Sequence, residues 1–149
     1  MSIFVNKIEI TEEEVGQEMQ YHPAPTQEQA WQMAAQSLIV RQLLLQQAAN
    51  NGLFEGDYSA IKPNQEEELI DQLLEMDVTV PEADEATCRR FYDSHPDSFR
   101  DSKSGERLAF EKAQGPIRDY LHTKAMRMAV AEYIKALSYN ANINGFELN

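Results

Sequence analysis

The chain has 149 residues, of which 42% are hydrophobic and 26% are charged, a balance typical of a soluble globular protein with one core. Its 25 acidic and 13 basic residues give a formal net charge of −12. This charge argues against binding to nucleic acid or to an anionic membrane surface, because both depend on basic side chains. We therefore expect any partner to be a protein.

The sequence also predicts where the protein is found. No apolar run approaches the roughly 20 residues needed to cross a bilayer, and the N-terminus lacks the basic start and long apolar stretch of a signal peptide. The single cysteine, Cys88, excludes an internal disulfide and suits a reducing compartment. We expect one domain over residues 1–149, located in the cytoplasm.

The first elements are marked by their residue types. Residues 3–10 are rich in β-branched and apolar residues and predict one short strand or a small hairpin. Thr11 followed by Glu14 has the spacing of a capping box and predicts a short helix that runs to about Gln20.

A long helix is expected next. Thr26 with Gln29 predicts its start, and the "NNG" of residues 50–52 predicts its end. Between Leu38 and Ala49 apolar residues fall on nearly every side, which is typical of a central helix that other elements cover.

Two shorter helices are predicted in the middle of the chain. Asn64 with Glu67 has the spacing of a helix start, and Asp84 is expected to cap the following helix. One face of that later helix carries residues at spacings of three, four and seven: Cys88, Phe91, Tyr92 and His95.

Apolar residues then recur at steps of three and four from Phe110 to Ala141, which predicts a helix about 45 Å long at about 1.5 Å per residue. Gly115-Pro116 lies inside this pattern and is expected to kink the helix or divide it in two.

The two ends of the chain resemble each other. Residues 5–10 and 143–148 both place a turn-forming pair between apolar residues. We hypothesise that they pair as a small antiparallel sheet; the alternative is that they are two unrelated ends.

No pattern of a catalytic or metal site stands out. The three histidines include no pair at the i, i+4 spacing of a helical metal motif, and no phosphate-binding loop is present. Cys88 and His95 would lie near 10 Å apart along a helix, too far for a nucleophile and its base, so Cys88 is expected in the core. We predict no catalytic residue, no metal and no cofactor.

Aromatic and methionine side chains are the better functional candidates, because such surface binds apolar peptide segments adaptably. We predict an apolar groove between the central helix, the fourth helix and the long helix. For each residue taken singly a place in the core is the competing interpretation. The candidates are Trp31, Leu38, Phe91, Tyr92, Phe99, Phe110 and Met128.

Nearly the whole chain resembles a known family in segments that include "AAQSLIVRQLLLQQAANNGL", "VPEADEATCRRFYDSHPDSF" and "ANINGFEL". It is similar to the chaperone-like portion of SurA/NifM-type parvulin peptidyl-prolyl isomerases, and most of all to the cytoplasmic NifM-like proteins. The resemblance implies a mainly α fold, a SurA-like helical chaperone domain with a long C-terminal helix.

The chain departs from this family at one place. In the family, a Tyr-x-x-x-Pro-x-x-Phe pattern leads into the parvulin domain. In this chain the pattern is matched by Tyr92 to Phe99. In this chain only a short polar segment follows, so we interpret 100–106 as the junction where that domain would be inserted, between segments 1–99 and 107–149. No histidine can be assigned a parvulin catalytic role.

The resemblance implies a non-catalytic, chaperone-like protein that binds apolar segments of a partly folded client. It suggests a metalloenzyme subunit, such as nitrogenase iron protein, as that client. A structural dimerisation or adaptor module is the alternative, with a homodimer formed by exchange of the long helix. A residual prolyl isomerase is a third hypothesis.

Overall fold

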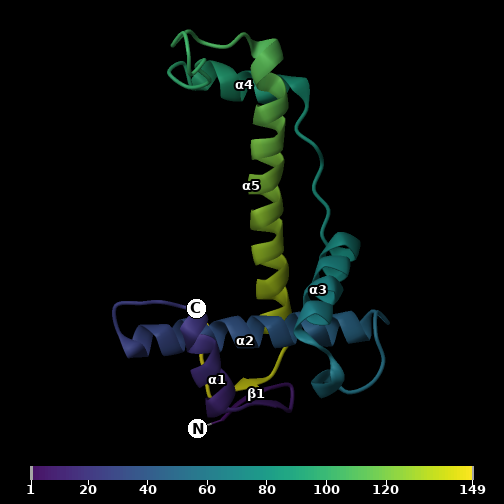
Figure 1. Cartoon of the computed structure of the whole chain (residues 1–149). Helices are drawn as coiled ribbons and strands as arrows, with labels where there is room; N and C mark the ends of the chain where they lie inside the picture. The colour runs from purple at the N-terminus through teal and green to yellow at the C-terminus, as the bar shows by residue number, and fades with distance from the viewer. Residues whose placement is uncertain (1, 149) are drawn as a thin grey trace. The chain divides into compact units, whose positions relative to one another are not determined.

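The computed structural model describes residues 2–148, apart from the side chain of Ser59. The fold is mainly helical and includes a three-stranded antiparallel sheet (Figure 1). Packing contacts group the chain into two compact units. Unit 1 comprises Met1–Asp77 and Glu132–Asn149, and unit 2 comprises Val78–Ala131. Each unit therefore draws on both predicted segments, 1–99 and 107–149.

The sheet belongs to unit 1. Strands β1 (Ile3–Val5) and β2 (Ile8–Ile10) form a hairpin whose two turn residues, Asn6 and Lys7, both have positive φ, at 50° and 76°. Two residues with φ > 0 fit a type I′ turn, which matches the natural twist of a hairpin. Strand β3 (Ile143–Asn144) pairs antiparallel with β1, with Val5 opposite Ile143.

The two predicted threonine caps are confirmed. The hydroxyl of Thr11 accepts a hydrogen bond from the Glu14 amide at 3.1 Å, and helix α1 (Glu12–Glu18) follows. The 3-10 turn η1 (Met19–Tyr21) continues it. The hydroxyl of Thr26 accepts from the Gln29 amide at 3.1 Å and begins α2 (Gln27–Asn50). Each cap satisfies a backbone donor that the helix leaves free.

The predicted start of the third helix at Asn64 is wrong. After the 3-10 turn η2 (Tyr58–Ala60), helix α3 runs Pro63–Asp77 and so places Asn64 inside the helix. Proline is well suited to a first helical position because its fixed φ is already helical and the missing N–H has no partner there.

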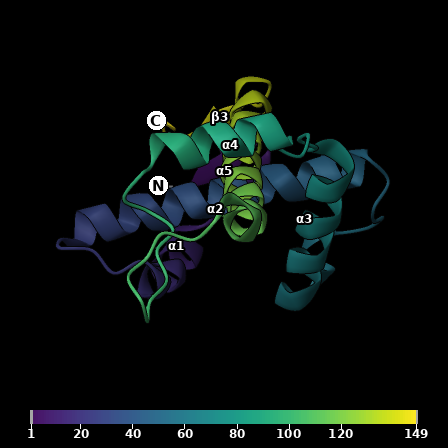
Figure 2. The same ribbon diagram turned by 90° about the horizontal axis from the view of Figure 1, so that it is seen from above.

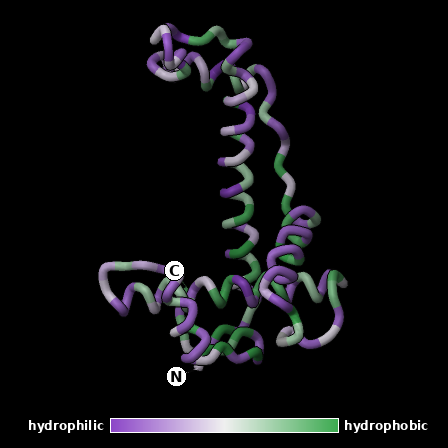
Figure 3. The backbone as a smooth tube through the Cα atoms, in the orientation of Figure 1, coloured by the Kyte–Doolittle hydropathy of each residue, from purple (hydrophilic) through white to green (hydrophobic). Residues whose placement is uncertain are grey.

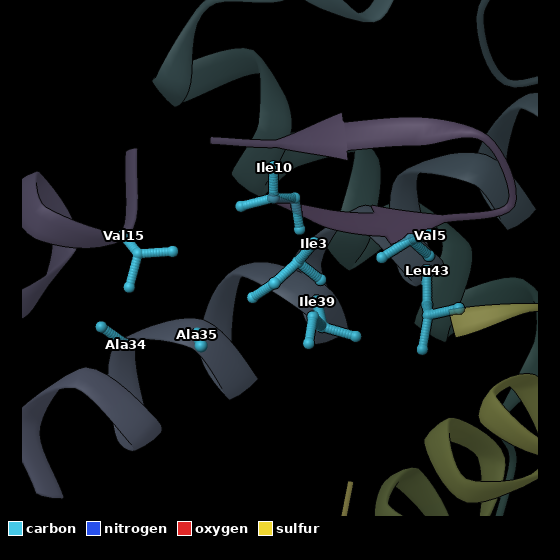
Figure 4. Close-up of a cluster of buried hydrophobic side chains, with 8 residues drawn as sticks. All are labelled: Ile3, Val5, Ile10, Val15, Ala34, Ala35, Ile39 and Leu43. Carbon is cyan, nitrogen blue, oxygen red and sulfur yellow. The ribbon is translucent and has the colours of Figure 1, made fainter. Parts of the chain in front are cut away.

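The core of unit 1 lies on two sides of α2. The apolar residues on nearly every side of this helix predicted such an arrangement. On one side the hairpin and α1 cover α2, and Figure 4 shows Ile3, Val5 and Ile10 directed toward Ile39 and Leu43. On the other side buried α2 residues meet α3 and the end of α5 (Phe110–Tyr139). The residues of this second cluster include Leu44, Ala48, Leu73, Ile134 and Leu137.

Unit 2 consists of α4 (Glu85–Ser94), the turn that follows it and the first part of α5, up to Ala131. The Asp84 carboxylate accepts from the Thr87 amide at 2.8 Å, which confirms the predicted cap. Helix α4 packs across the first turns of α5 (Figures 1 and 2). Cys88 is fully buried in this contact, as expected.

Of the two expected effects of Gly115-Pro116, a kink or a division, the division does not occur: α5 is one helix of 30 residues with Pro116 inside it. The ring of a proline clashes with the Cβ of the residue before it, and that residue is Gly115, which has no Cβ. Buried Ala113 and Ile117 on either side hold this turn against α4.

The helices differ in polarity along the chain (Figure 3). α3 is coloured largely hydrophilic, in keeping with six acidic residues and no basic residue between Pro63 and Asp77. In the described part of the chain, no helix combines the length and the apolar character that a membrane crossing requires.

Candidate functional site

The predicted groove residues fall into both units. Trp31 and Leu38 belong to unit 1. The other five candidates belong to unit 2: Phe91, Tyr92, Phe99, Phe110 and Met128.

The four aromatic candidates of unit 2 converge on one cluster. Tyr92 stacks on Phe99 with ring centroids 5.9 Å apart and meets the edge of Phe110 at 5.6 Å. Phe91 contacts Phe99 at 5.9 Å, and these rings surround buried Cys88. Aromatic pairs at such distances stabilise a core beyond their buried area. The cluster is therefore chiefly the core that joins α4 to α5.

The polar segment after Phe99 is a closed hairpin-like turn. Arg100 and Arg107 form an antiparallel bridge, and the Gly105 amide donates to the Asp101 carbonyl at 2.9 Å. Gly105 has φ of 73°, which its missing side chain permits. The two ends of the segment thus lie side by side.

Side chains of α4 fasten this turn. The Tyr92 hydroxyl donates to the Leu108 carbonyl, and the Arg107 guanidinium donates to the Tyr92 carbonyl. The same guanidinium lies 3.8 Å from the centroid of the Tyr92 ring, a cation–π contact. The aromatic cluster and the turn therefore form one packed structure.

Trp31 has a different environment, at the open edge of the sheet. Its ring lies 5.9 Å from that of Phe146, and the two side chains border a surface hollow of about 650 Å³. Strand β3 forms the side of this hollow and pairs only with β1 within the described sheet. The remaining lining residues are Gln32, Ile143, Asn144, Gly145 and Glu147.

A second hollow, of about 460 Å³, lies along the start of α2 and also includes Gln32. Pro23, Pro25 and Met33 supply its apolar surface, and Glu28 supplies a carboxylate. Met33 is 47% exposed, which leaves its thioether available for contact. The "PAP" before α2 is the sequence signal for this hollow, and the prediction did not use it.

A third hollow, of about 480 Å³, was missed by the sequence prediction. Residues 53–61 and the outer face of α3 line it. Its apolar side chains are Leu53, Phe54, Ala60, Ile61 and Leu69, and its carboxylates include those of Glu55 and Glu68. The sequence signal is weak, because a loop of mixed composition gives no periodic pattern.

Leu38 and Met128 complete the predicted set. Leu38 is half-buried, packs against the core beside the hairpin, and borders a smaller hollow with Tyr21. Met128 is 63% exposed on α5. Of the seven candidates, Met128 thus presents an open apolar side chain, whereas Leu38 and the four unit 2 aromatics contribute to cores.

Charged groups around α2 act in packing. The Arg41 guanidinium lies 3.9 Å from Glu18 of α1 and 3.8 Å from Glu66 of α3. Burial raises the pKa of Glu66, Arg41 opposes this shift, and the like charge of Glu18 adds to it. Among the described residues, no three histidine, cysteine or carboxylate side chains gather as a metal site would require.

No family model, curated protein or solved structure matches this chain.

Proposed function

We propose that this protein is a non-catalytic, chaperone-like protein that binds apolar segments of a partly folded client. The observation that carries the proposal is the surface of unit 1. Two adjoining hollows there, one beside Trp31 and one along the start of α2, each combine apolar side chains with a carboxylate. Apolar clefts with a few polar groups are the usual form of a binding site.

The Trp31 hollow has two features that suit an extended peptide. Its side is the edge strand β3, whose backbone can accept a further strand, and its base is the pair of rings of Trp31 and Phe146. Addition of a strand supplies main-chain hydrogen bonds, while adjoining apolar surface selects side chains. Met33 extends the apolar surface from the neighbouring hollow.

The charge of unit 1 specifies the client further. The carboxylates of Glu28 and Glu147 border the two adjoining hollows. Complementary charge steers association and selects among partners, so we propose clients in which apolar and basic residues alternate or adjoin. The resemblance to the chaperone-like portion of SurA/NifM-type proteins supports this proposal, and a metalloenzyme subunit as client rests on that resemblance alone. A cytoplasmic location belongs to the same proposal.

Fluorescence provides a direct test, because Trp31 is the single tryptophan of the chain. A peptide of leucine, lysine and glycine, titrated into the protein, should shift the Trp31 emission to shorter wavelength. A matched peptide with glutamate in place of lysine should bind at least about tenfold more weakly. Equal binding of the two peptides would exclude the proposed role of the carboxylates.

Two methionine variants test the location. Met33→Lys places a positive charge in the hollow and should weaken binding of the lysine peptide, whereas Met76→Lys places the same charge on an exposed methionine of α3 outside the three hollows. Equal affinity of both variants, with unchanged helicity by circular dichroism, would rule out this surface as the client site.

A further inference from the structure

The charge of the chain is divided unevenly between the two units. Of the 25 acidic and 13 basic residues, nine of each lie in Val78–Ala131, so unit 2 is neutral in sum. The other 16 acidic and four basic residues lie in unit 1, which therefore carries the whole net charge of −12. A local group of cations on neutral unit 2 of one molecule would therefore be attracted to acidic unit 1 of another.

An apolar stripe on α5 begins inside unit 2 and continues beyond its core. Phe110, Ala113 and Ile117 are buried against α4. The same helical face continues with half-buried Leu121 and Ala125 and with Met128, which is 63% exposed. We call Leu121, Ala125 and Met128 the α5 stripe. Its last two members take no part in the cluster that α4 covers.

Basic side chains flank the stripe. At 100° per residue, Lys124 and Arg118 lie about 60° to either side of it, while Asp119 falls on the opposite face. Lys124 is exposed and Arg118 half-buried, and in the described part of the chain neither forms an ion pair. Glu132, one turn beyond Met128, marks the end of this surface. The stripe is thus an apolar strip with two available cations.

The acidic hollow beside α3 has the complementary composition. Five apolar side chains line it, and Glu55 and Glu68 stand among them without a basic partner in the described structure. Helix α3 itself has six acidic residues and no basic one. A methionine flanked by a lysine fits such a surface, because its flexible side chain fills irregular apolar space while the ammonium group meets a carboxylate.

We propose that the α5 stripe binds a second copy of this chain, in the acid-lined hollow formed by residues 53–61 and α3. The contact goes beyond the proposed client binding, since it uses a different hollow from that of Trp31. Every copy carries both surfaces, so the stripe of one copy can bind in the hollow of another. A single stripe is small beside the roughly 1,600 Å² of a standard interface, so we expect a dimer with micromolar affinity.

Sedimentation velocity of the full chain tests the proposal over protein concentrations of roughly 10 to 500 µM. Wild type should shift from monomer to dimer, and raising the salt from about 0.05 M to about 0.5 M should weaken the dimer because it screens the cations. A monomer throughout this range at low salt would overturn the proposal. So would a dimer of equal strength at both salt concentrations.

Matched charge reversals locate the contact. Lys124→Glu should weaken the dimer at least about tenfold, whereas Lys103→Glu, the same change in the exposed 100–107 turn, should leave it unchanged. Met128→Glu should also weaken it, and addition of Glu68→Lys to Lys124→Glu should restore it. Equal effects of the two lysine variants, or failure of the restoration in a chain of normal helicity, would contradict the proposed contact.

This outcome is separable from client binding. The Trp31 emission assay reports peptide binding in unit 1, and Lys124→Glu should leave that assay unchanged. A loss of peptide binding in Lys124→Glu would show that the two surfaces are one and would contradict their separation.

Discussion

The Tyr133 hydroxyl donates a hydrogen bond of 2.6 Å to the Asp77 carboxylate. The Asn51 side chain donates to the same carboxylate oxygen at 2.9 Å. Asp77 ends α3, Asn51 caps α2 and Tyr133 comes from the last turns of α5. One carboxylate thus links three elements that are distant in sequence, at the border of the second core cluster of unit 1.

We expect Tyr133→Phe to destabilise the protein by about 1 to 2 kcal/mol, because it removes a hydrogen bond to a charged acceptor while keeping the ring. Equilibrium unfolding in urea measures this change. Tyr139→Phe is the matched control, since Tyr139 is 77% exposed, and it should have no effect. Similar loss in both variants would show that the Asp77 bond contributes nothing specific.

The same bond predicts a pH dependence. Burial raises the pKa of Tyr133, and the hydrogen bond and negative charge of Asp77 raise it further, so folding favours the neutral phenol. Stability from this group is complete below the ordinary tyrosine pKa of about 10 and is lost as the pH rises above it. The stability advantage of wild type over Tyr133→Phe should therefore shrink above pH 10. A constant difference would contradict the shift.

Glu66 is predicted to respond in the acid range. Because burial raises its pKa, the ionised carboxylate is disfavoured in the folded state, and this group alone stabilises the protein as the pH falls toward the ordinary glutamate pKa of about 4.3. Glu66→Gln should accordingly be at least as stable as wild type at pH 7 and should lose that advantage at about pH 4. Thermal unfolding at the two pH values measures it, with exposed Glu67→Gln as the control.

If Glu66→Gln were clearly less stable than wild type at pH 7, the ion pair with Arg41 at 3.8 Å would outweigh the burial of the carboxylate. Such a result would reverse the expected sign.

Gly145 supports the pairing of β1 with β3 through its missing side chain. Its φ is 89°, and a Cβ placed there would lie 2.7 Å from the Ser2 carbonyl oxygen. Gly145→Ala should cost about 1 to 3 kcal/mol and speed amide exchange in β1 and β3. Gly52→Ala has a comparable φ of 78° but open space around the new Cβ, so it should cost less. If the two variants lost equal stability, backbone strain alone would explain the loss, and the closeness of the Ser2 carbonyl oxygen to residue 145 would have no role.

At Phe99 we expect a glycine variant to be more stable than an alanine variant, the reverse of the usual order. It has φ of 63°, a left-handed conformation that residues with a Cβ rarely adopt. Phe99→Ala and Phe99→Gly both lose the ring contacts with Phe91 and Tyr92, but glycine adopts this φ without strain. We expect the glycine variant to be more stable than the alanine variant by about 1 kcal/mol, by urea unfolding. The usual order, with alanine more stable, would mean that the turn does not hold this φ.

Much of the local structure could be predicted because its causes lie within a few residues. Thr11, Thr26 and Asp84 cap their helices with side chains that reach the amide three residues later. The all-round apolar pattern of α2 likewise predicted a central helix. Whether Gly115-Pro116 would kink or divide the helix could not be decided from the sequence, because the cost of a proline depends on the residue before it and on what packs around that turn.

The candidate site was harder to predict, because a helical pattern of apolar residues does not reveal where their cover ends. Phe91, Tyr92 and Phe99 are core residues because α4 and the 100–107 turn fold onto each other. Met128 continues the same stripe and is open because the cluster with α4 stops short of it.

By itself, the sequence determined that the chain is mainly helical, the caps at Thr11, Thr26 and Asp84, extended structure at the start of the chain and the acidic charge, all of which follow from neighbouring residues or from composition. Only the tertiary structure decided that Trp31 borders a hollow with Phe146, that Tyr133 meets Asp77, and that the net charge collects in one unit. The physical reason is that burial, contact and local charge depend on which distant segments meet. Separation along the chain does not reveal which segments these are.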